Sequence, residues 1–168
     1  LHERHAHLTL DVLAPPFTLP LLSRMPEVRR DIVARFGHGE LKLNERRRLA
    51  HTLRGAQYDQ AIVLPNSLKS ALIPLLAKIP VRTGFRGEMR YGLLNDLRML
   101  DEKALPRMVE RFAALALDRG AALPPKLPSP KLTAILSNVE TIVQKQQLTL
   151  EKPIAVLCPG AEYGPAKR

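Results

Sequence analysis

A short apolar run near the end of the chain is followed by residues that suit phosphate binding. The run Ile154–Cys158 has the composition of a buried parallel strand, and the ten residues after it contain Gly160 and end on Lys167 and Arg168. In α/β proteins, a glycine-containing loop after a buried strand presents main-chain N–H groups and a cation to an anion. The sequence therefore predicts a phosphate pocket at this end.

Three arginines spaced four residues apart form a second candidate for anion binding. Arg82, Arg86 and Arg90 lie in a stretch that also contains three glycines. A glycine-rich basic segment is not typical of a solvated helix face, and planar guanidinium groups hold carboxylates and phosphates through paired hydrogen bonds. The pattern indicates a loop that binds an acidic ligand, with Glu88 paired to one of the arginines.

Polar residues also follow the apolar run Gln60–Leu64, at the start of the next expected helix. Ligands of open α/β sheets bind at the carboxyl ends of strands, so Asn66, Ser67 and Lys69 are candidates for ligand contact. The plainer interpretation is that Asn66 caps the helix. Both interpretations stay open, because a capped helix N-terminus also attracts anions.

Other reactive residue types give weaker indications. His2, His5 and His7 lack Cys or carboxylate partners at metal-binding spacing, and no Asp-x-Asp motif is present, so we expect no metal site and no cofactor. Cys158 is interpreted as a small apolar residue, because no His lies near it in the sequence. The run Arg46–Arg48 is interpreted as the solvated face of a helix, with anionic lipid as an alternative partner.

Apolar periodicity predicts the elements that carry these residues. Strands are expected at 8–13, 31–36, 60–64, 81–85 and 154–158. Helices are expected at 17–23, 44–55, 66–76, 106–120 and 131–147. The alternating order predicts an α/β fold with a parallel sheet that contains both 8–13 and 60–64, whereas 154–158 opens a separate sheet.

Composition divides the chain into three parts. Residues 121–130 contain four prolines and no periodicity, which is typical of a linker. We predict an incomplete Rossmann-like domain over 1–120, a linker and connecting helix over 121–152, and the start of a second domain over 153–168. Because the chain begins at Leu1 without Met and ends before the next expected helix, we interpret it as an internal piece of a longer protein, lacking its first strand.

Charge is the unusual bulk property of these 168 residues. Hydrophobic residues make up 45% and charged residues 25%, as in globular proteins, but the net charge is +10. Such a charge suits nucleic acid, an anionic membrane surface or a phosphorylated substrate. Aromatic residues amount to only 4%, and no zinc-finger, basic-zipper or RNP-type motif is present, which disfavours nucleic acid. No apolar run reaches the roughly 18 residues of a transmembrane helix.

Segments 58–71, 82–96 and 159–168, supported by 21–28, share their sequence pattern with a known group of enzymes. On these segments the chain resembles the lipopolysaccharide heptosyltransferase II family of Gram-negative bacteria. The similarity runs from about residue 10 to the end and is most specific in 82–96. It implies the glycosyltransferase B fold, of which this chain would hold the Rossmann-like N-terminal half and the start of the C-terminal half.

The resemblance also implies a reaction, in which heptose passes from ADP-heptose to the first heptose of the inner core with inversion. A base must deprotonate the acceptor, and cations must stabilise the leaving ADP. The implied base is an Asp upstream of Leu1, so the chain alone is expected to be inactive. The residues implied at the donor pyrophosphate are Lys167, Arg168 and Gly160. The acceptor carries carboxylates and phosphates, and the residues expected to bind it, from the patterns above, are Arg82, Arg86, Arg90, Asn66, Ser67 and Lys69.

The expected partners are ADP-heptose, the lipopolysaccharide inner core and, peripherally, the inner membrane. The expected enzyme is a cytoplasmic monomer that binds no nucleic acid. Two alternatives stay open. One is heptosyltransferase I or a relative with a different acceptor. The other is a basic module without chemistry that binds nucleic acid or an anionic membrane.

Overall fold

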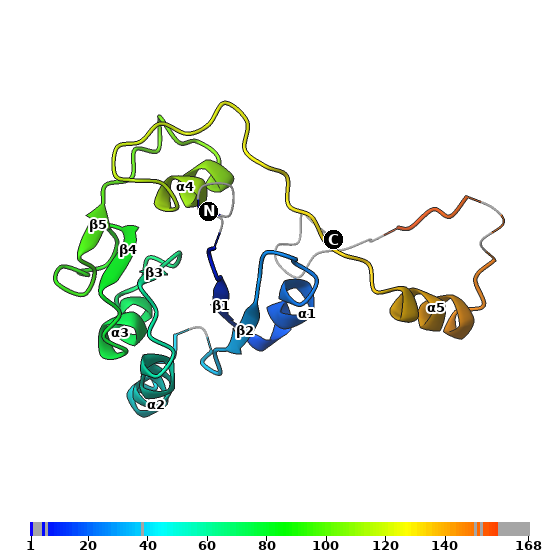
Figure 1. Cartoon of the computed structure of the whole chain (residues 1–168), viewed down its shortest axis with the longest axis horizontal. Coiled ribbons are helices and arrows are strands. Elements are labelled where there is room, and N and C mark those ends of the chain that lie inside the picture. Colours follow the sequence, from blue (N-terminus) through cyan, green and yellow to red (C-terminus); the bar gives the residue numbers. More distant parts are fainter. Residues whose placement is uncertain (2–4, 6, 38, 150, 152, 158–168) are drawn as a thin grey trace. The chain divides into compact units, whose positions relative to one another are not determined.

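The computed structural model describes residues 1, 5, 7–37, 39–149, 151 and 153–157, in two compact units. The first unit, Leu1–Lys131, contains the strands and all but one of the helices found in the described residues. The second, Leu132–Arg168, contains helix α5, Leu136–Lys145 (Figure 1). The division into domains at 120 and 152 stays a prediction.

Short parallel strands build two sheets in the first unit (Figure 1). Strand β1 (Asp11–Ala14) pairs with β2 (Arg30–Val33), with Asp11 opposite Arg30. The second sheet has the order β3-β4-β5, formed by Gln60–Ile62, Val81–Phe85 and Asp96–Arg98. The expected α/β class with parallel sheets is confirmed, and so is the strand at 81–85.

Helices connect and cover these strands. They are the 3-10 helix η1 (Pro16–Thr18), α1 (Leu19–Leu22), α2 (Leu43–Arg54), α3 (Leu68–Leu76) and α4 (Met108–Leu115). Helix α2 begins after Lys42, not at Asn44 as expected from its capping preference, and no side chain caps it. Helix α5 is shorter than the expected 131–147.

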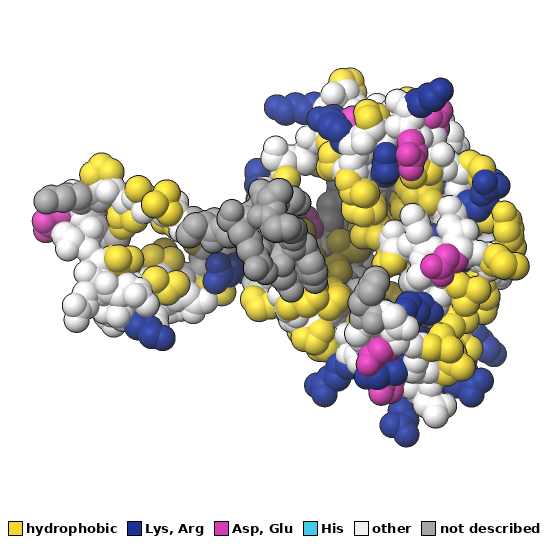
Figure 2. All heavy atoms as spheres, turned by 180° about the vertical axis from the view of Figure 1, so that it is seen from behind, with side chains coloured by type: hydrophobic (Ala, Val, Ile, Leu, Met, Phe, Trp, Pro, Cys, Tyr) yellow, Lys and Arg dark blue, Asp and Glu magenta, His cyan; other side chains and the backbone are white. Residues whose placement is uncertain are grey.

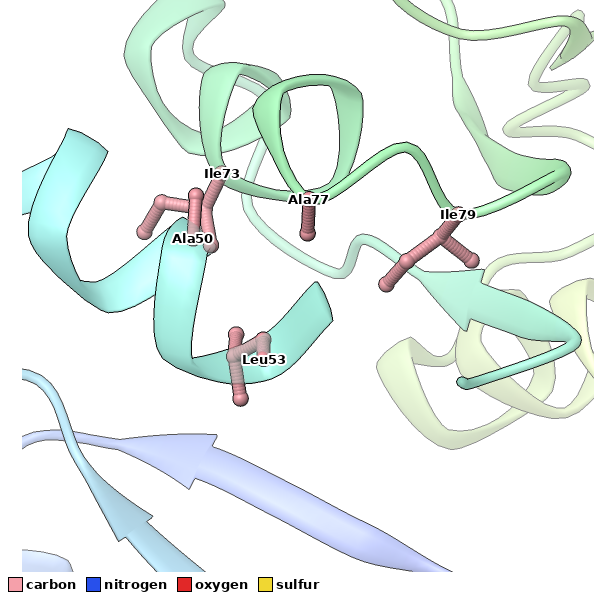
Figure 3. Packing of buried hydrophobic residues seen from close by; sticks show 5 residues of the cluster. All are labelled: Ala50, Leu53, Ile73, Ala77 and Ile79. Carbon is pink, nitrogen blue, oxygen red and sulfur yellow. The ribbon is translucent and has the colours of Figure 1, made fainter. Parts of the chain in front are cut away.

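One aliphatic core lies between α2 and α3 (Figure 3). Its buried members come from α2, from α3 and the residue after it, and from the segment before β4. They are Ala50, Leu53, Ile73, Ala77 and Ile79. Leu13 of β1, Ile32 of β2 and Ala61 of β3 pack against this cluster, so both sheets contribute to the same core. Each Å² of apolar surface that is buried contributes about 25 cal/mol to the stability of the fold, and burial at this core holds the two sheets in one unit.

The prediction of a single sheet through 8–13 and 60–64 is wrong for the described residues. Strand β1 begins only at Asp11, and its one partner there is β2, whereas β3 pairs only with β4. Side chains link the two sheets instead of a main-chain ladder: the Tyr58 hydroxyl, two residues before β3, donates to Asp11. Apolar runs identify strands, but they carry no information about which strands pair.

The prediction of a strand at 154–158 is also wrong as far as the structure describes it. Residues 154–157 form neither a helix nor a strand, and Ile154, Val156 and Leu157 are 51%, 78% and 87% exposed. Cys158 lies outside the described residues. An extended segment becomes a strand only when its N–H and C=O groups meet a partner, and no described segment provides one.

Candidate functional site

Two loops meet at the carboxyl end of the β3-β4-β5 sheet. The first, residues 63–67, leads from β3 into α3, and the second, residues 86–95, leads from β4 into β5. The main-chain N–H of Glu88 donates to the oxygen of Asn66 at 3.1 Å. A Cβ at Gly87 would lie 2.9 Å from the Cβ of Asn66 and still closer to its carbonyl oxygen, so only glycine allows this approach. The loops therefore form one surface at the edge where α/β proteins bind ligands.

Arg90 joins the two loops from inside. Its side chain is only 1% exposed. Nη1 donates to the oxygen of Pro65 at 2.5 Å, and Nη2 donates to Asn66 Oδ1 at 3.2 Å and to the oxygen of Phe85. Burial lowers the pKa of Arg90, whereas the nearby Glu88 carboxylate acts in the opposite direction. Nε of Arg90 is buried without a hydrogen-bond partner in the described residues.

Glu88 has a different partner from the arginine that the sequence suggested. Its Oε2 accepts a 2.9 Å hydrogen bond from the main-chain N–H of Leu68, the first residue of α3. A carboxylate at this position satisfies a free donor and interacts favourably with the helix dipole. The N-terminus of α3 is therefore already occupied by an acidic group of the chain itself.

The polar residues after β3 lie beside this surface. Asn66 does not cap α3, because the N-cap residue is Ser67, which makes no side-chain capping bond. The Asn66 side chain accepts from Arg90 instead, since a fully buried guanidinium needs acceptors more than an exposed helix end does. Lys69 is half-buried, and its main-chain oxygen accepts from Arg46 Nη1 at 3.2 Å.

The three arginines of the second segment have three different environments. Arg82 lies in the first half of β4, where Nε donates to the oxygen of Leu93 at 2.8 Å and Nη1 to that of Ile79 at 2.6 Å. Arg90 is buried as described. Arg86 is exposed, and its side chain has no partner among the residues that the structure describes. Of the three, Arg86 has its guanidinium available to a ligand.

Arg46, which the sequence placed on a solvated helix face, is buried. The expected solvated face at Arg46–Arg48 is wrong for this residue, which is 4% exposed. Its guanidinium stacks on Phe36, 4.2 Å from the ring centroid, and Nε and Nη2 donate to the oxygens of Leu41 and Glu40. Burial lowers its pKa. Its neighbours Arg47 and Arg48 are exposed as expected; the apolar run Leu49-Ala50 beside Arg46 was the available signal that this turn faces the core.

The phosphate-pocket residues Gly160, Lys167 and Arg168 lie outside the described residues. Among those that are described, no group of three or more His, Cys, Asp or Glu side chains is arranged to hold a metal. Within the same part of the chain, no helix is long and apolar enough to cross a membrane. Lys and Arg side chains are spread over the face seen in Figure 2 rather than gathered into one patch.

The chain has parallel sheets, helices that share one core, and a basic loop at the carboxyl edge of a sheet. These features define a Rossmann-like α/β protein of the kind that binds ligands at that edge. The structure matches one solved for the ADP-heptose lipopolysaccharide heptosyltransferase II of E. coli with a TM-score of 0.87 at 49% identity, covering 99% of this chain and 50% of that one. The family model of glycosyltransferase family 9 (heptosyltransferase) matches residues 46–168, and the chain belongs to this family.

The curated relatives that the chain matches are also heptosyltransferases. The chain is 53% identical to lipopolysaccharide heptosyltransferase 2 of Salmonella typhimurium and 51% identical to that of Escherichia coli, each over 173 aligned positions. It is 49% identical to lipooligosaccharide heptosyltransferase 2 of Haemophilus influenzae. All of this chain is covered in each case, and it spans about half the length of these relatives.

Proposed function

We propose that this chain is the acceptor-side half of an enzyme that transfers heptose from ADP-heptose to the first heptose of the lipopolysaccharide inner core. The observation that carries the proposal is the identity of 51–53% to two lipopolysaccharide heptosyltransferases 2 over the whole chain. Similarity at this level, together with the same fold, favours the same reaction over the basic binding module.

The reaction is an inverting single displacement. A base takes the proton of the acceptor hydroxyl, its oxygen attacks the anomeric carbon of heptose, and ADP leaves from the opposite face. We propose an Asp upstream of Leu1 as the base, and Lys167 and Arg168, beside Gly160, as the cations that stabilise the leaving pyrophosphate. The 168 residues alone would then lack activity.

The acceptor would bind at the surface formed by the β3–α3 and β4–β5 loops. Arg86 is our choice for direct contact with an acceptor carboxylate or phosphate, because its guanidinium is exposed. Lys69 and Ser67 lie next to the same surface. Arg82, Arg90 and Asn66 would act through the loop, since their side chains already have protein partners.

In the cell, we propose a cytoplasmic enzyme that meets its lipid-linked acceptor at the inner face of the inner membrane. The enzyme would work as a monomer without nucleic acid. Domain 1–120 would hold the acceptor, and the domain that begins near 153 would hold ADP-heptose.

A direct assay tests the function. The complete enzyme is incubated with ADP-heptose and core acceptors that end either on the first heptose or on the sugar before it. Release of ADP with the heptose-ended acceptor only is the expected result. Transfer to the shorter acceptor would assign the chain to heptosyltransferase I, and no transfer to either, with retained vesicle or nucleic-acid binding, would favour the basic module.

A further inference from the structure

The β4–β5 loop exposes side chains of a kind that proteins usually bury. Met89 is 79% exposed and Tyr91 is 64% exposed, and Arg86 is also exposed on the same loop. None of the three side chains has a hydrogen-bond or ion-pair partner in the described residues. Between Met89 and Tyr91, Arg90 points inward and is buried. The side chains of Met89, Arg90 and Tyr91 therefore point outward, inward and outward in turn.

This loop is held firmly despite its exposed side chains. Its first residue donates from the main-chain N–H of Arg86 to the oxygen of Arg98 at 2.7 Å, and Glu88 bonds to both Asn66 and Leu68. The Arg90 fork closes it against Pro65 and Asn66. A rigid loop loses little conformational entropy when a ligand binds, which favours affinity.

Burial of the Arg90 guanidinium has a cost in folding free energy. A buried guanidinium loses its hydration, and its unpartnered Nε adds the cost of an unsatisfied donor. An apolar residue at this position would avoid both costs but would leave the oxygens of Pro65, Phe85 and Asn66 without this donor. Arg90 therefore fixes the loop that carries Arg86, Met89 and Tyr91 against the loop before α3.

Tyr, Met and Arg are the residue types that recognition surfaces favour, because each gives a large contact area and Tyr and Arg add hydrogen-bond donors. The charge of Arg86 complements an acidic ligand. The location, at the carboxyl edge of the sheet, is that of a ligand site.

We propose that Tyr91 and Met89 are specificity-determining residues for the sugar part of the acceptor, and that Arg90 is the positioning residue that fixes them. The proposal rests on the proposed function. The Tyr91 ring lies against the apolar face of a pyranose while its hydroxyl bonds to a sugar oxygen, Met89 extends this apolar contact, and Arg86 binds an acidic group of the same saccharide.

Two measurements on matched variants test this. The first is saturation-transfer NMR of the 168-residue chain with an inner-core oligosaccharide of acidic sugar and heptose, without donor. The second is steady-state kinetics of the complete enzyme, varying acceptor and ADP-heptose in turn. Tyr91→Ala is compared with Phe17→Ala, because Phe17 is also an exposed aromatic residue, at 83%, on a different element. Met89→Ala is compared with Met108→Ala, which changes a methionine 58% exposed on α4.

The expected result is that Tyr91→Ala raises the acceptor KM about tenfold or more, as loss of an aromatic contact in a binding surface does, and weakens the NMR signal. The donor KM of Tyr91→Ala keeps its wild-type value. Both control variants keep the wild-type acceptor KM and NMR signal. Arg90→Lys has the same selective effect, because a lysine keeps the charge but cannot form the fork.

Three outcomes would overturn the inference. One is an unchanged acceptor KM in Tyr91→Ala while the wild type transfers heptose, which leaves the proposed function intact. Another is saccharide binding that Tyr91→Ala preserves while binding to anionic vesicles falls, which assigns the loop to the membrane. The last is a wild-type chain that neither binds the saccharide nor, in the complete enzyme, transfers heptose, and then both proposals fail.

Discussion

The hydroxyl of Tyr58 donates a 2.5 Å hydrogen bond to Oδ2 of Asp11 and thereby links the segment before β3 to the first residue of β1. Arg29 holds the same carboxylate through Nε and Nη2, at 2.8 and 2.7 Å, and Arg30 lies 3.2 Å from it. The Asp11 side chain is 1% exposed. The hydrogen bonds from Arg29 contribute most to lowering the pKa of Asp11 to about 2, against the effect of burial.

Asp11 should therefore make stability depend on pH. The pKa of Asp11 in the folded state lies below its unfolded value of about 3.9. Asp11 therefore adds about 2 kcal/mol to the free energy of unfolding above a pH of about 3.9, and this contribution is lost as the pH falls toward 2. In urea unfolding, Asp11→Asn should be less stable than wild type at pH 7, with a smaller difference at pH 3. Asp31→Asn, which changes an exposed Asp of β2, is the control. A difference that is equal at both pH values would refute the linkage.

Gly87→Ala should displace the two candidate loops. The new Cβ would overlap the main chain of Asn66, and neither backbone can move without loss of the Glu88–Asn66 hydrogen bond. We expect a loss of about 1–3 kcal/mol in thermal or urea unfolding, with a raised acceptor KM. Gly55→Ala is the matched control, because the nearest atom lies 3.6 Å from its added Cβ and its φ is −65°. Equal behaviour of the two variants would show that the loops can separate freely.

Arg46→Met should destabilise the first unit although it removes a charge from a chain of net charge +10. The substitution leaves the oxygens of Glu40, Leu41 and Lys69 without their donor and removes the stacking on Phe36. We expect a loss of about 2 kcal/mol or more. Arg47→Met, one residue along and exposed, should lie within about 0.5 kcal/mol of wild type in the same denaturation experiment.

Lys167→Ala in the complete enzyme should lower turnover of ADP-heptose at least about tenfold with folding intact. Loss of one charge-assisted contact to the leaving pyrophosphate corresponds to about 1.5–3 kcal/mol. Steady-state kinetics with ADP-heptose, together with a melting curve, measure both properties. Unchanged kinetics would mean that Lys167 is a solvated side chain, and a lowered melting temperature would attribute the loss to folding.

Sequence patterns located the elements better than their pairing. Apolar runs identified β3 and β4, but β5 was missed because two of its three residues, Asp96 and Arg98, are charged. Those charges are tolerated because they pair at 2.7 Å, and Thr83 and Arg119 also donate to Asp96. Such compensation depends on side chains that meet only after folding, so local composition cannot reveal it.

The role of the candidate site stays a prediction. The spacing of Arg82, Arg86 and Arg90 pointed to this part of the chain, but Arg82 lies in β4 and only Arg86 and Arg90 lie in the loop after it. A spacing of four residues does not place side chains on one side outside a helix. Which arginine turns inward is decided by the carbonyls of Pro65 and Phe85, which come from different parts of the chain. Arg90 therefore could not be distinguished from a solvated arginine on sequence alone, whereas the apolar Leu49 and Ala50 were a signal for the burial of Arg46.

The two separate sheets have a practical consequence for handling this polypeptide. Within the described residues, β1 has β2 as its one ladder partner and β3 has β4, so each sheet ends in a row of unpaired N–H and C=O groups. Such groups can pair with strands from other molecules. We expect the isolated 168-residue chain to self-associate as its concentration rises. Light scattering across a dilution series, rather than activity, would be the first guide to its sample quality.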